Sequence, residues 1–465
     1  MKIHFYGAAR TVTGSQHLIE VNGKKVLLEC GIFQGRRRDF YKRNCCFAFD
    51  PKELDAVILS HAHIDHSGNL PNLVKQGYSG PIYATPPTAE LASIMLADSG
   101  HIYEEDVEFL NKKKRKHGEP MVKPLYTRMD AEKVPPLFKK IGYDQPFEPV
   151  SGMTARFMDA GHILGSAAVV LDIEDKGKKK RLWFSGDIGR FKLPLLRDPV
   201  LPEKPDVLLM ECTYGNRPHG DPEEAYLAFR DVVKRTILRG GNVVVPAFSV
   251  GRTQELVYSL NRMISEGELP RMPVYVDSPL AINATDIFRR HPEYFDDETR
   301  EFTRTGNHPA LDYPGLAYTR SVEQSKAINR SETPSVIISA SGMCEAGRIL
   351  HHLIHNIENQ RNTICIVSWQ APYTLGRRLA EGQAKVRIFG EEVRVQAEIA
   401  SINGLSAHGG QNMLLKYAES ANQNGLKEIF LVHGDDEPAA VLTEKLRERG
   451  ITNVRYPERG EVAGF

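Results

Sequence analysis

Short apolar segments that stop at Gly, Asp or His recur along this chain, and they constrain its fold more than any other feature. In the first 205 residues these segments are 2–7, 25–31, 55–61, 154–162, 167–174 and 181–187. Apolar runs of this length, bounded by turn or polar residues, are typical of strands. One helix-like segment, near 69–76, also falls in this part of the chain. The first 205 residues are therefore predicted to be strand-rich α/β.

From Asp206 the pattern changes to strand, turn and amphipathic helix. Apolar runs such as DVLLMEC and NVVVPAF precede helical patterns near 222–239, 252–266, 279–290 and 345–359. This alternation predicts a parallel, doubly wound sheet. Strand-like alternation returns after about residue 390, in VRVQAEIASI and later in EIFLVHG. We therefore predict an inserted domain at 206–390, with 391–465 completing the domain that 1–205 begins.

The composition is that of a globular protein without a strong overall charge. Of 465 residues, 41% are hydrophobic, and 60 basic side chains balance 59 acidic ones. A net charge of +1 creates no overall field, so a polyanionic partner must be held by a local patch. The six Cys show no CxxC spacing and are expected to be reduced thiols. We see no signal peptide or membrane span and expect a cytoplasmic protein.

The strongest functional signal is the motif His61-Ala-His63-Ile-Asp65-His66, which lies where the apolar run 55–60 stops. The irregular spacing fits neither one face of a helix nor one face of a strand, which predicts a loop at a strand end. Imidazole and carboxylate groups suit zinc, and two adjacent ions can act together on a phosphodiester. The alternative is a polar loop with chance histidines. Because His accounts for only 16 of 465 residues, three within six positions argue against that alternative.

Two further candidates, His162 and Asp187, each follow an apolar run in the same way. The ordered motifs HAHIDHSG, DAGHILGS, FSGDIGR, ECTYGNR, PAFSVGRTQEL, SASGMCEAGR, INGLSAHGG and LVHGDDE resemble those of the metallo-β-lactamase fold, and specifically its β-CASP branch. That branch includes ribonuclease J and the pre-mRNA 3′-end cleavage endonuclease. The resemblance covers essentially the whole chain. It implies a four-layered αββα metal-binding domain with an inserted α/β β-CASP domain, and an active site between them.

The resemblance also implies a ligand set for two zinc ions per chain. His61, His63 and His162 would hold one ion, Asp65, His66 and His408 would hold the other, and Asp187 would bridge them. Glu211 would support a metal ligand or the proton transfers, and His433 would lie near the site. The residues expected to take part in catalysis are Asp65, Asp187, Glu211, His433 and Arg378.

Two positions depart from the family pattern. Glu29 stands where the family usually has Asp, and its longer arm is expected to alter the surroundings of the metal ligands. Arg378 aligns with a motif that often carries a His in contact with the scissile phosphate. Arginine can stabilise phosphoryl charge but cannot act as a general acid at neutral pH.

Basic and Gly-containing segments are candidates for binding RNA. Residues 112–116 (KKKRK) are all basic, and a second run, 176–181, is more typical of a solvated hairpin tip. Contacts from the first run would make RNA binding salt-dependent. Two strand-to-helix turns offer backbone N–H groups and Gly for phosphate, although ordinary helix capping is the alternative. The candidate RNA-binding residues are Lys112, Lys113, Lys114, Arg115, Lys116, Ser249, Arg252, Ser341, Gly342 and Arg348.

The leading hypothesis is a zinc-dependent ribonuclease that cleaves single-stranded RNA. Endonucleolytic and 5′-to-3′ exonucleolytic cleavage are both open. One alternative is a catalytically weakened RNA-binding partner, which the departures at Glu29 and Arg378 would favour. Another is a hydrolase of small esters or thioesters, against which the long insertion argues. No membrane partner is expected, and a homodimer is allowed for.

Overall fold

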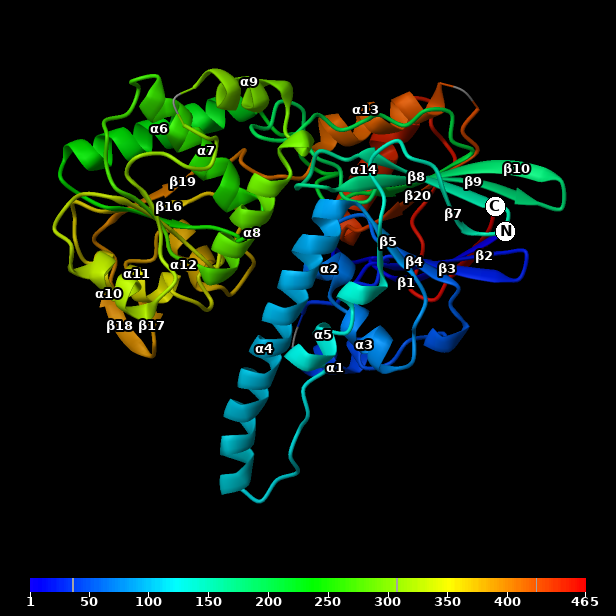
Figure 1. The fold of residues 1–465 in the computed structure, drawn as a ribbon, viewed down its shortest axis with the longest axis horizontal. Coiled ribbons are helices and arrows are strands. Elements are labelled where there is room, and N and C mark those ends of the chain that lie inside the picture. Colours follow the sequence, from blue (N-terminus) through cyan, green and yellow to red (C-terminus); the bar gives the residue numbers. More distant parts are fainter. Residues whose placement is uncertain (36, 307, 424) are drawn as a thin grey trace. The chain divides into compact units, whose positions relative to one another are not determined.

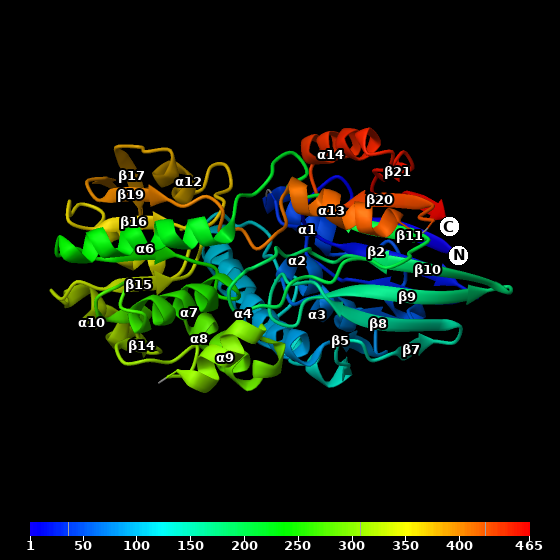
Figure 2. The same ribbon diagram turned by 90° about the horizontal axis from the view of Figure 1, so that it is seen from above.

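The computed structural model describes residues 1–35, 37–306, 308–423 and 425–465, which form two compact units (Figures 1 and 2). Unit 1 comprises Met1–Phe191, Asp198–His219 and His408–Phe465, and unit 2 comprises Lys192–Arg197 and Gly220–Ala407. The chain is thus α/β with an insertion, as predicted. The predicted domain limits, 205/206 and 390/391, stay a prediction, because compact units need not coincide with domains.

Unit 1 contains two seven-stranded sheets. In spatial order the first sheet consists of β22 (Val462–Gly464), β1 (Lys2–Gly7), β2 (Gln16–Val21), β3 (Lys24–Leu28), β4 (Ala56–Ile58), β5 (Ile82–Ala84) and β6 (Phe138–Lys140). The second consists of β21 (Val454–Arg455), β20 (Glu428–Val432), β11 (Val207–Glu211), β10 (Lys178–Phe184), β9 (Ala167–Asp175), β8 (Met153–Asp159) and β7 (Phe147–Val150). All five residues of β11 are buried, because this strand pairs in parallel with β10 and β20.

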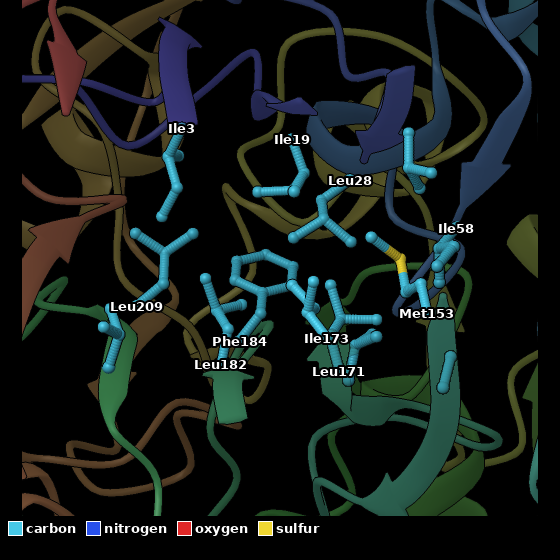
Figure 3. Packing of buried hydrophobic residues seen from close by; sticks show 14 of the residues in the cluster. Ile3, Ile19, Leu28, Ile58, Met153, Leu171, Ile173, Leu182, Phe184 and Leu209 are labelled. Atoms are coloured by element: carbon cyan, nitrogen blue, oxygen red, sulfur yellow. The ribbon is translucent and has the colours of Figure 1, made fainter. Parts of the chain in front are cut away.

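The main core lies between these two sheets, where apolar side chains from both interdigitate (Figure 3). Alternate residues of each strand face inward, which explains the alternating burial of strands such as β8. The first sheet contributes Ile3, Ile19, Leu28 and Ile58, and the second contributes Leu171, Ile173, Leu182, Phe184 and Leu209. This packing holds the carboxyl ends of β4, β10, β11 and β20 in fixed positions.

Helices cover the outer faces of both sheets and complete the four αββα layers (Figure 1). On the second sheet, α13 (Gln411–Asn422) and α14 (Asp436–Glu448) bury a second apolar cluster, in which the Trp183 indole N–H donates to the Tyr417 hydroxyl at 2.7 Å. The helices on the first sheet's side are α1 (Arg37–Asn44), α2 (Ile64–Ser67), α3 (Leu70–Lys75), α4 (Pro86–Lys116) and α5 (Arg128–Ala131). Short 3-10 turns occur at Pro51–Glu53 and Pro135–Leu137.

The 31-residue helix α4 is absent from the sequence prediction. It begins at Pro86, where the Thr85 hydroxyl accepts a hydrogen bond from Thr88 N–H, and Pro at the first positions costs no hydrogen bond. Its first half is apolar and buried, whereas its second half is dominated by charged residues. Among the described residues, no helix combines the length and apolar character needed to cross a bilayer.

Unit 2 contains a six-stranded parallel sheet and a hairpin. In spatial order the sheet consists of β14 (Leu316–Tyr318), β13 (Val274–Val276), β15 (Val336–Ser339), β12 (Val243–Pro246), β16 (Thr363–Ile366) and β19 (Glu398–Ser401). The hairpin consists of β17 (Lys385–Ile388) and β18 (Glu391–Arg394). Its helices are α6 (Pro222–Leu238), α7 (Arg252–Ser265), α8 (Pro279–Arg290), α9 (Asp297–Thr305), α10 (Val322–Arg330), α11 (Ile349–Asn356) and α12 (Leu375–Ala380), with a 3-10 turn at Pro292–Tyr294.

The segment 391–402 contains the strand β19 and lies next to the predicted boundary at 390/391. The sequence pattern places these strand-like residues in the returning first domain, but β19 pairs in parallel with β16 and so remains in unit 2. Alternating apolar residues specify a strand without specifying its neighbour, so the sequence pattern alone does not determine which sheet β19 joins.

Candidate metal centre

Residues from six parts of unit 1 converge where its strands end. His61 and His63 follow β4, and Asp65 and His66 lie in α2. The other members come from later parts of the chain and are His162, after β8, Asp187, after β10, Glu211, at the end of β11, His408, before α13, and His433, directly after β20. All of these residues except Glu211 therefore lie beyond regular strands, on segments whose positions the packed sheets determine.

The motif at 61–66 is only partly a loop. Asp65 and His66 form the first turn of the four-residue helix α2, so the two halves of the motif diverge toward different neighbours. The turn is anchored by backbone hydrogen bonds from Ser15 N–H to Asp65 C=O and from Cys30 N–H to His66 C=O, both 2.8 Å long. A side chain at Gly31 would place its Cβ 1.6 Å from the Asp65 carbonyl oxygen, so only Gly permits this approach.

The first cluster contains His61, His63, His162 and Asp187. His63 Nδ1 lies 3.1 Å from His61 Nε2 and 3.2 Å from His162 Nε2. Asp187 Oδ2 lies 3.4 Å from His61 Nε2 and 3.5 Å from His162 Nε2. Burial lowers the pKa of His61 to about 3 and that of His63 to about 4. The imidazoles are therefore neutral and their nitrogen atoms converge, which is the arrangement that a cation requires.

The second cluster contains Asp65, His66 and His433. His433 Nε2 lies 3.1 Å from His66 Nε2 and 3.4 Å from Asp65 Oδ2. The predicted grouping joined His408 to Asp65 and His66, whereas the structure brings His433 to these two residues, and the ligand set stays a prediction. His433 occupies that position because β20 pairs with β11 and ends beside α2, whereas His408 faces Asp187 and Glu211.

Asp187 joins the two clusters. Its Oδ2 faces His61 and His162, while its Oδ1 lies 3.2 Å from His66 Nε2 and 3.5 Å from His433 Nδ1. Burial would raise the pKa of Asp187, but the surrounding histidines hold it well below its usual range. Asp187 Oδ1 and His162 Nδ1 are both buried without a hydrogen-bond partner among the described residues. A carboxylate with one oxygen on each cluster is placed to bridge two cations.

Glu29 fixes the orientation of His66. Its carboxylate accepts hydrogen bonds from Ser60 N–H at 2.6 Å and from Ser60 Oγ at 2.9 Å, and it lies 2.5 Å from His66 Nδ1. These contacts leave His66 Nε2 directed toward His433 and Asp187. Burial alone would lower the pKa of His66, but Asp187, Asp65 and Glu29 raise it well above its ordinary value. The Glu29 side chain thus contacts a histidine of the second cluster directly, and its effect on metal binding stays a prediction.

Glu211 and His408 form a pair beside the clusters. His408 Nδ1 lies 3.2 Å from Glu211 Oε1, and that oxygen also accepts a hydrogen bond from Ile188 N–H at 2.6 Å. Burial would lower the pKa of His408, but Glu211 and Asp187 raise it to about 9. A protonated His408 can therefore donate a proton next to the two clusters.

Sequence reasoning missed Thr213, which supports His433. Its hydroxyl lies 3.1 Å from His433 Nδ1 and donates to the His433 carbonyl at 3.0 Å. Thr213 stands two residues after Glu211, just beyond the end of β11, in the segment ECTYG. This position after a strand could have indicated a residue near the site.

The predicted RNA-binding residues of unit 2 are mostly engaged in contacts within that unit. Arg252 is buried and paired with Glu255, and its Nη1 donates to the Tyr226 hydroxyl at 3.2 Å. Arg348 donates to Asp277 at 2.6 Å and to the Thr319 carbonyl at 3.0 Å. These contacts favour a structural role for both arginines.

The remaining candidates in unit 2 lie in turns. Ser249 Oγ is 3.2 Å from Ser278 Oγ, and Ser341 Oγ accepts from Glu345 N–H at 3.2 Å, which caps the turn that also contains Gly342. Arg378 lies in α12, where its Nε donates to the Thr374 carbonyl at 3.4 Å. The role of Arg378 in catalysis stays a prediction.

Residues 112–116 form the last turns of α4. Lys112 pairs with Glu108 at 2.9 Å, Lys114 pairs with Glu119 at 2.8 Å, and the Lys113 ammonium lies 4.6 Å from the Phe109 ring centroid. Such exposed pairs are weak and exchange readily with solvent or another anion. The run therefore remains available to a polyanion.

The chain matches three family models. These are the metallo-β-lactamase superfamily over residues 9–199, the β-CASP domain over 253–379, and a Zn-dependent metallo-hydrolase RNA specificity domain over 392–457. The chain is 37% identical to ribonuclease TTHA0252 of Thermus thermophilus, with 98% of this chain and 99% of that protein covered.

Further relatives and a solved structure agree with these matches. The transcription termination factor FttA of Methanosarcina mazei is 30% identical, with 98% of this chain and 71% of that protein covered. A structure of a protein of unknown function from Enterococcus faecalis has the same fold, with a TM-score of 0.56, 14% identity and 99% of both chains covered. This chain therefore belongs to the β-CASP ribonucleases of the metallo-β-lactamase superfamily, and it is a metal-dependent hydrolase.

Proposed function

We propose that the protein holds two zinc ions and hydrolyses phosphodiester bonds of single-stranded RNA. The observation that carries this proposal is the position of Asp187, whose two oxygens face two separate groups of ligand atoms. The match to an RNA specificity domain and the identity to a ribonuclease support RNA as the substrate. A homodimer and a cytoplasmic location stay predictions.

The donor sets fit zinc. One ion would be held by His61, His63, His162 and Asp187, and the other by Asp65, His66, His433 and Asp187. Two nitrogens bound at ~2.0–2.1 Å to one tetrahedral ion lie roughly 3.3 Å apart. The nitrogen pairs His61–His63, His63–His162 and His66–His433 are 3.1 Å, 3.2 Å and 3.1 Å apart. Burial lowers the pKa of His61, His63 and His162, so the short distances within the first cluster are explained by a shared cation better than by a shared proton.

The chain's own residues would position the reactants and move the protons. Bound zinc ions would supply a water of lowered pKa and would polarise a phosphoryl oxygen. Glu29 holds the His66 ring in place, and Thr213 does the same for the His433 ring. His408, whose Nδ1 lies 3.2 Å from Glu211 Oε1, would donate a proton to the leaving oxygen. Such proton transfer contributes typically 10²–10⁴-fold to a rate.

The test combines elemental analysis with cleavage of RNA labelled at either end. Folded protein should contain two zinc ions per chain and should cut single-stranded RNA. Asp65→Ala should reduce cleavage roughly a thousandfold or more, because a misplaced nucleophile costs several kcal/mol of barrier and each 1.36 kcal/mol is tenfold. Asp106→Ala, which removes an exposed carboxylate from α4, is the matched control and should retain activity.

Two outcomes would overturn this proposal. Binding of RNA without any cleavage, in the presence of zinc or manganese and with any 5′ end, would establish a catalytically inactive RNA-binding protein. Equal cleavage by the wild type and Asp65→Ala would assign the activity to a contaminant.

A further inference from the structure

Three exposed aromatic side chains lie at one edge of the unit 2 sheet. Phe248 follows β12 and is 44% exposed, while Trp369 and Tyr373 follow β16 and are 46% and 93% exposed. Single exposed apolar side chains are ordinary in proteins. These three differ because β12 and β16 are parallel neighbours, so the loops after them leave the same edge of the sheet. The carboxyl edge of a parallel sheet is where such folds bind ligands.

The loop after β15 connects these two loops into one surface. Gln370 Nε2 donates to the Gly342 carbonyl at 2.9 Å, and Gly376 N–H donates to the Met343 carbonyl at 3.1 Å. A Cβ at Gly342 would lie 3.2 Å from the Phe248 ring, so the absence of a side chain there allows close packing. The aromatic rings are therefore carried by loops that are tied together.

Tyr373 is held in an unusual backbone conformation. Its φ is +72°, which is rare and unfavourable for a bulky side chain, and yet its ring is almost fully exposed. The adjacent Thr374 fixes this turn, because its hydroxyl donates to the Ala371 carbonyl at 2.8 Å and accepts from Arg377 N–H at 3.2 Å. Burial of the ring does not explain the strain, since the ring contributes little to the core.

Arg378, in α12, lies one helical turn after Thr374. Arg377 pairs with Glu381 at 2.6 Å, but Arg378 has no carboxylate partner among the residues that the structure describes. Exposed aromatic rings, with an unpaired guanidinium five residues after Tyr373, match the chemistry of a single-stranded nucleic acid. Its bases stack on such rings and its phosphates attract cations.

We propose that Phe248, Trp369 and Tyr373 form a stacking surface for the unpaired bases of RNA. The proposal rests on the proposed function and adds to it a basis for selecting single strands. Bases in a duplex already stack on one another and present only their edges, so they cannot occupy this surface. The preference for single-stranded over duplex RNA would then depend on unit 2 and would not require bound metal.

Tryptophan fluorescence tests this proposal directly. The chain has two tryptophans, of which Trp183 is 2% exposed and Trp369 is 46% exposed. Metal-free protein in EDTA would be titrated with an adenine-rich 12-nucleotide RNA, with a 12-base-pair duplex RNA and with an abasic 12-mer. We expect the single strand to quench the emission of Trp369, and the duplex and abasic strands to do so weakly. Equal quenching and equal affinity for all three would overturn the proposal.

Variants separate stacking from other contacts. Trp369→Ala and Tyr373→Ala should each weaken binding of the 12-mer roughly 5- to 150-fold, which is the range for loss of one stacked base. Trp369→Phe should retain most of the affinity while losing the fluorescence signal. The matched control is Phe389→Ala, because Phe389 is 55% exposed in unit 2 but lies between β17 and β18.

The outcomes distinguish this proposal from the proposed function. If Trp369→Ala and Phe389→Ala bind the 12-mer as tightly as the wild type, the stacking surface is refuted even if the RNA is cut normally. If the protein stacks RNA but never cuts it, the hydrolytic function fails while the stacking surface stands. A Trp369→Phe variant as weak as Trp369→Ala would also contradict stacking, since Phe retains an aromatic face.

Discussion

His66 Nε2 lies 3.1 Å from His433 Nε2, although 367 positions separate the two residues. The proximity results from two strands whose ends are fixed by the same core. Residue 66 follows β4 of the first sheet, and residue 433 follows β20 of the second sheet. The second metal cluster therefore depends on how the sheets pack, whereas the sequence motif at 61–66 supplies only part of it.

Replacement of His433 and of His408 should have different consequences. We expect His433→Ala to lose about one zinc ion per chain, because its Nε2 belongs to the cluster with Asp65 and His66. We expect His408→Ala to retain both ions but to lower turnover about 10²- to 10⁴-fold, because a proton donor is lost. Elemental analysis and cleavage of saturating RNA would measure both effects. Equal metal loss in the two variants would contradict this division of roles.

Asp187→Asn should reduce metal content more than any single His replacement in the first cluster. The amide keeps the size of the carboxylate but removes the negative charge that faces both clusters. Two cations without a bridging anion repel each other, so we expect the site to hold fewer than two zinc ions. Circular dichroism would establish that the variant is folded, and two retained ions would refute the bridging role.

Replacing Lys112, Lys113, Lys114, Arg115 and Lys116 with Gln should weaken RNA binding and flatten its dependence on salt. Each lost phosphate contact reduces the slope of log K against log salt by roughly 0.7 for a single strand. Turnover at saturating RNA should change little. The matched control is the replacement of Lys176, Lys178, Lys179 and Lys180, which lie at the turn and start of the β9–β10 hairpin. An unchanged slope for the first variant would identify that run as a solvated surface.

Asp277 should make the stability of unit 2 depend on acid pH. Burial would raise the pKa of Asp277, but hydrogen bonds from His352, Ser325, Thr319 and Arg348 hold it well below its ordinary value. A depressed folded-state pKa stabilises the fold above the unfolded-state pKa, and this contribution is lost as pH falls. Metal-free wild type should therefore lose more stability than Asp277→Asn between pH 6 and pH 3, as measured by urea unfolding. Parallel losses in the two proteins would contradict this linkage.

The sequence predicted the features that depend on local pattern. Apolar runs and turn residues predicted helices such as α7 and α8 and the strands β1, β3, β4, β8, β9, β10, β11 and β20, but they did not predict β2, β5, β6 or β7. His61, His63, Asp65 and His66 were recognisable from their spacing. The roles of His408 and His433 were not recognisable in this way. Both histidines are isolated in sequence, and only the pairing of β20 with β11 determines which of them reaches Asp65.

The burial of α7 and the pairing of β19 also depend on contacts between distant parts of the chain. The sequence made Arg252 a candidate for RNA contact, but α7 is buried along most of its length and Arg252 pairs with Glu255 inside it. The strand β19 joins a sheet whose other members precede it by more than 30 residues. Such long-range pairing is decided by the packing of whole sheets, and a single sequence carries little information about it.

The position of His433 also bears on synthesis of the protein. His61, His63 and His66 leave the ribosome before His433, so the cluster that includes His433 cannot form until the chain has been extended from residue 66 to residue 433 and β20 has joined its sheet. Domains fold as they are synthesised, at roughly 5–20 residues per second. For tens of seconds the growing chain therefore cannot bring His433 to Asp65 and His66, and the second cluster stays incomplete.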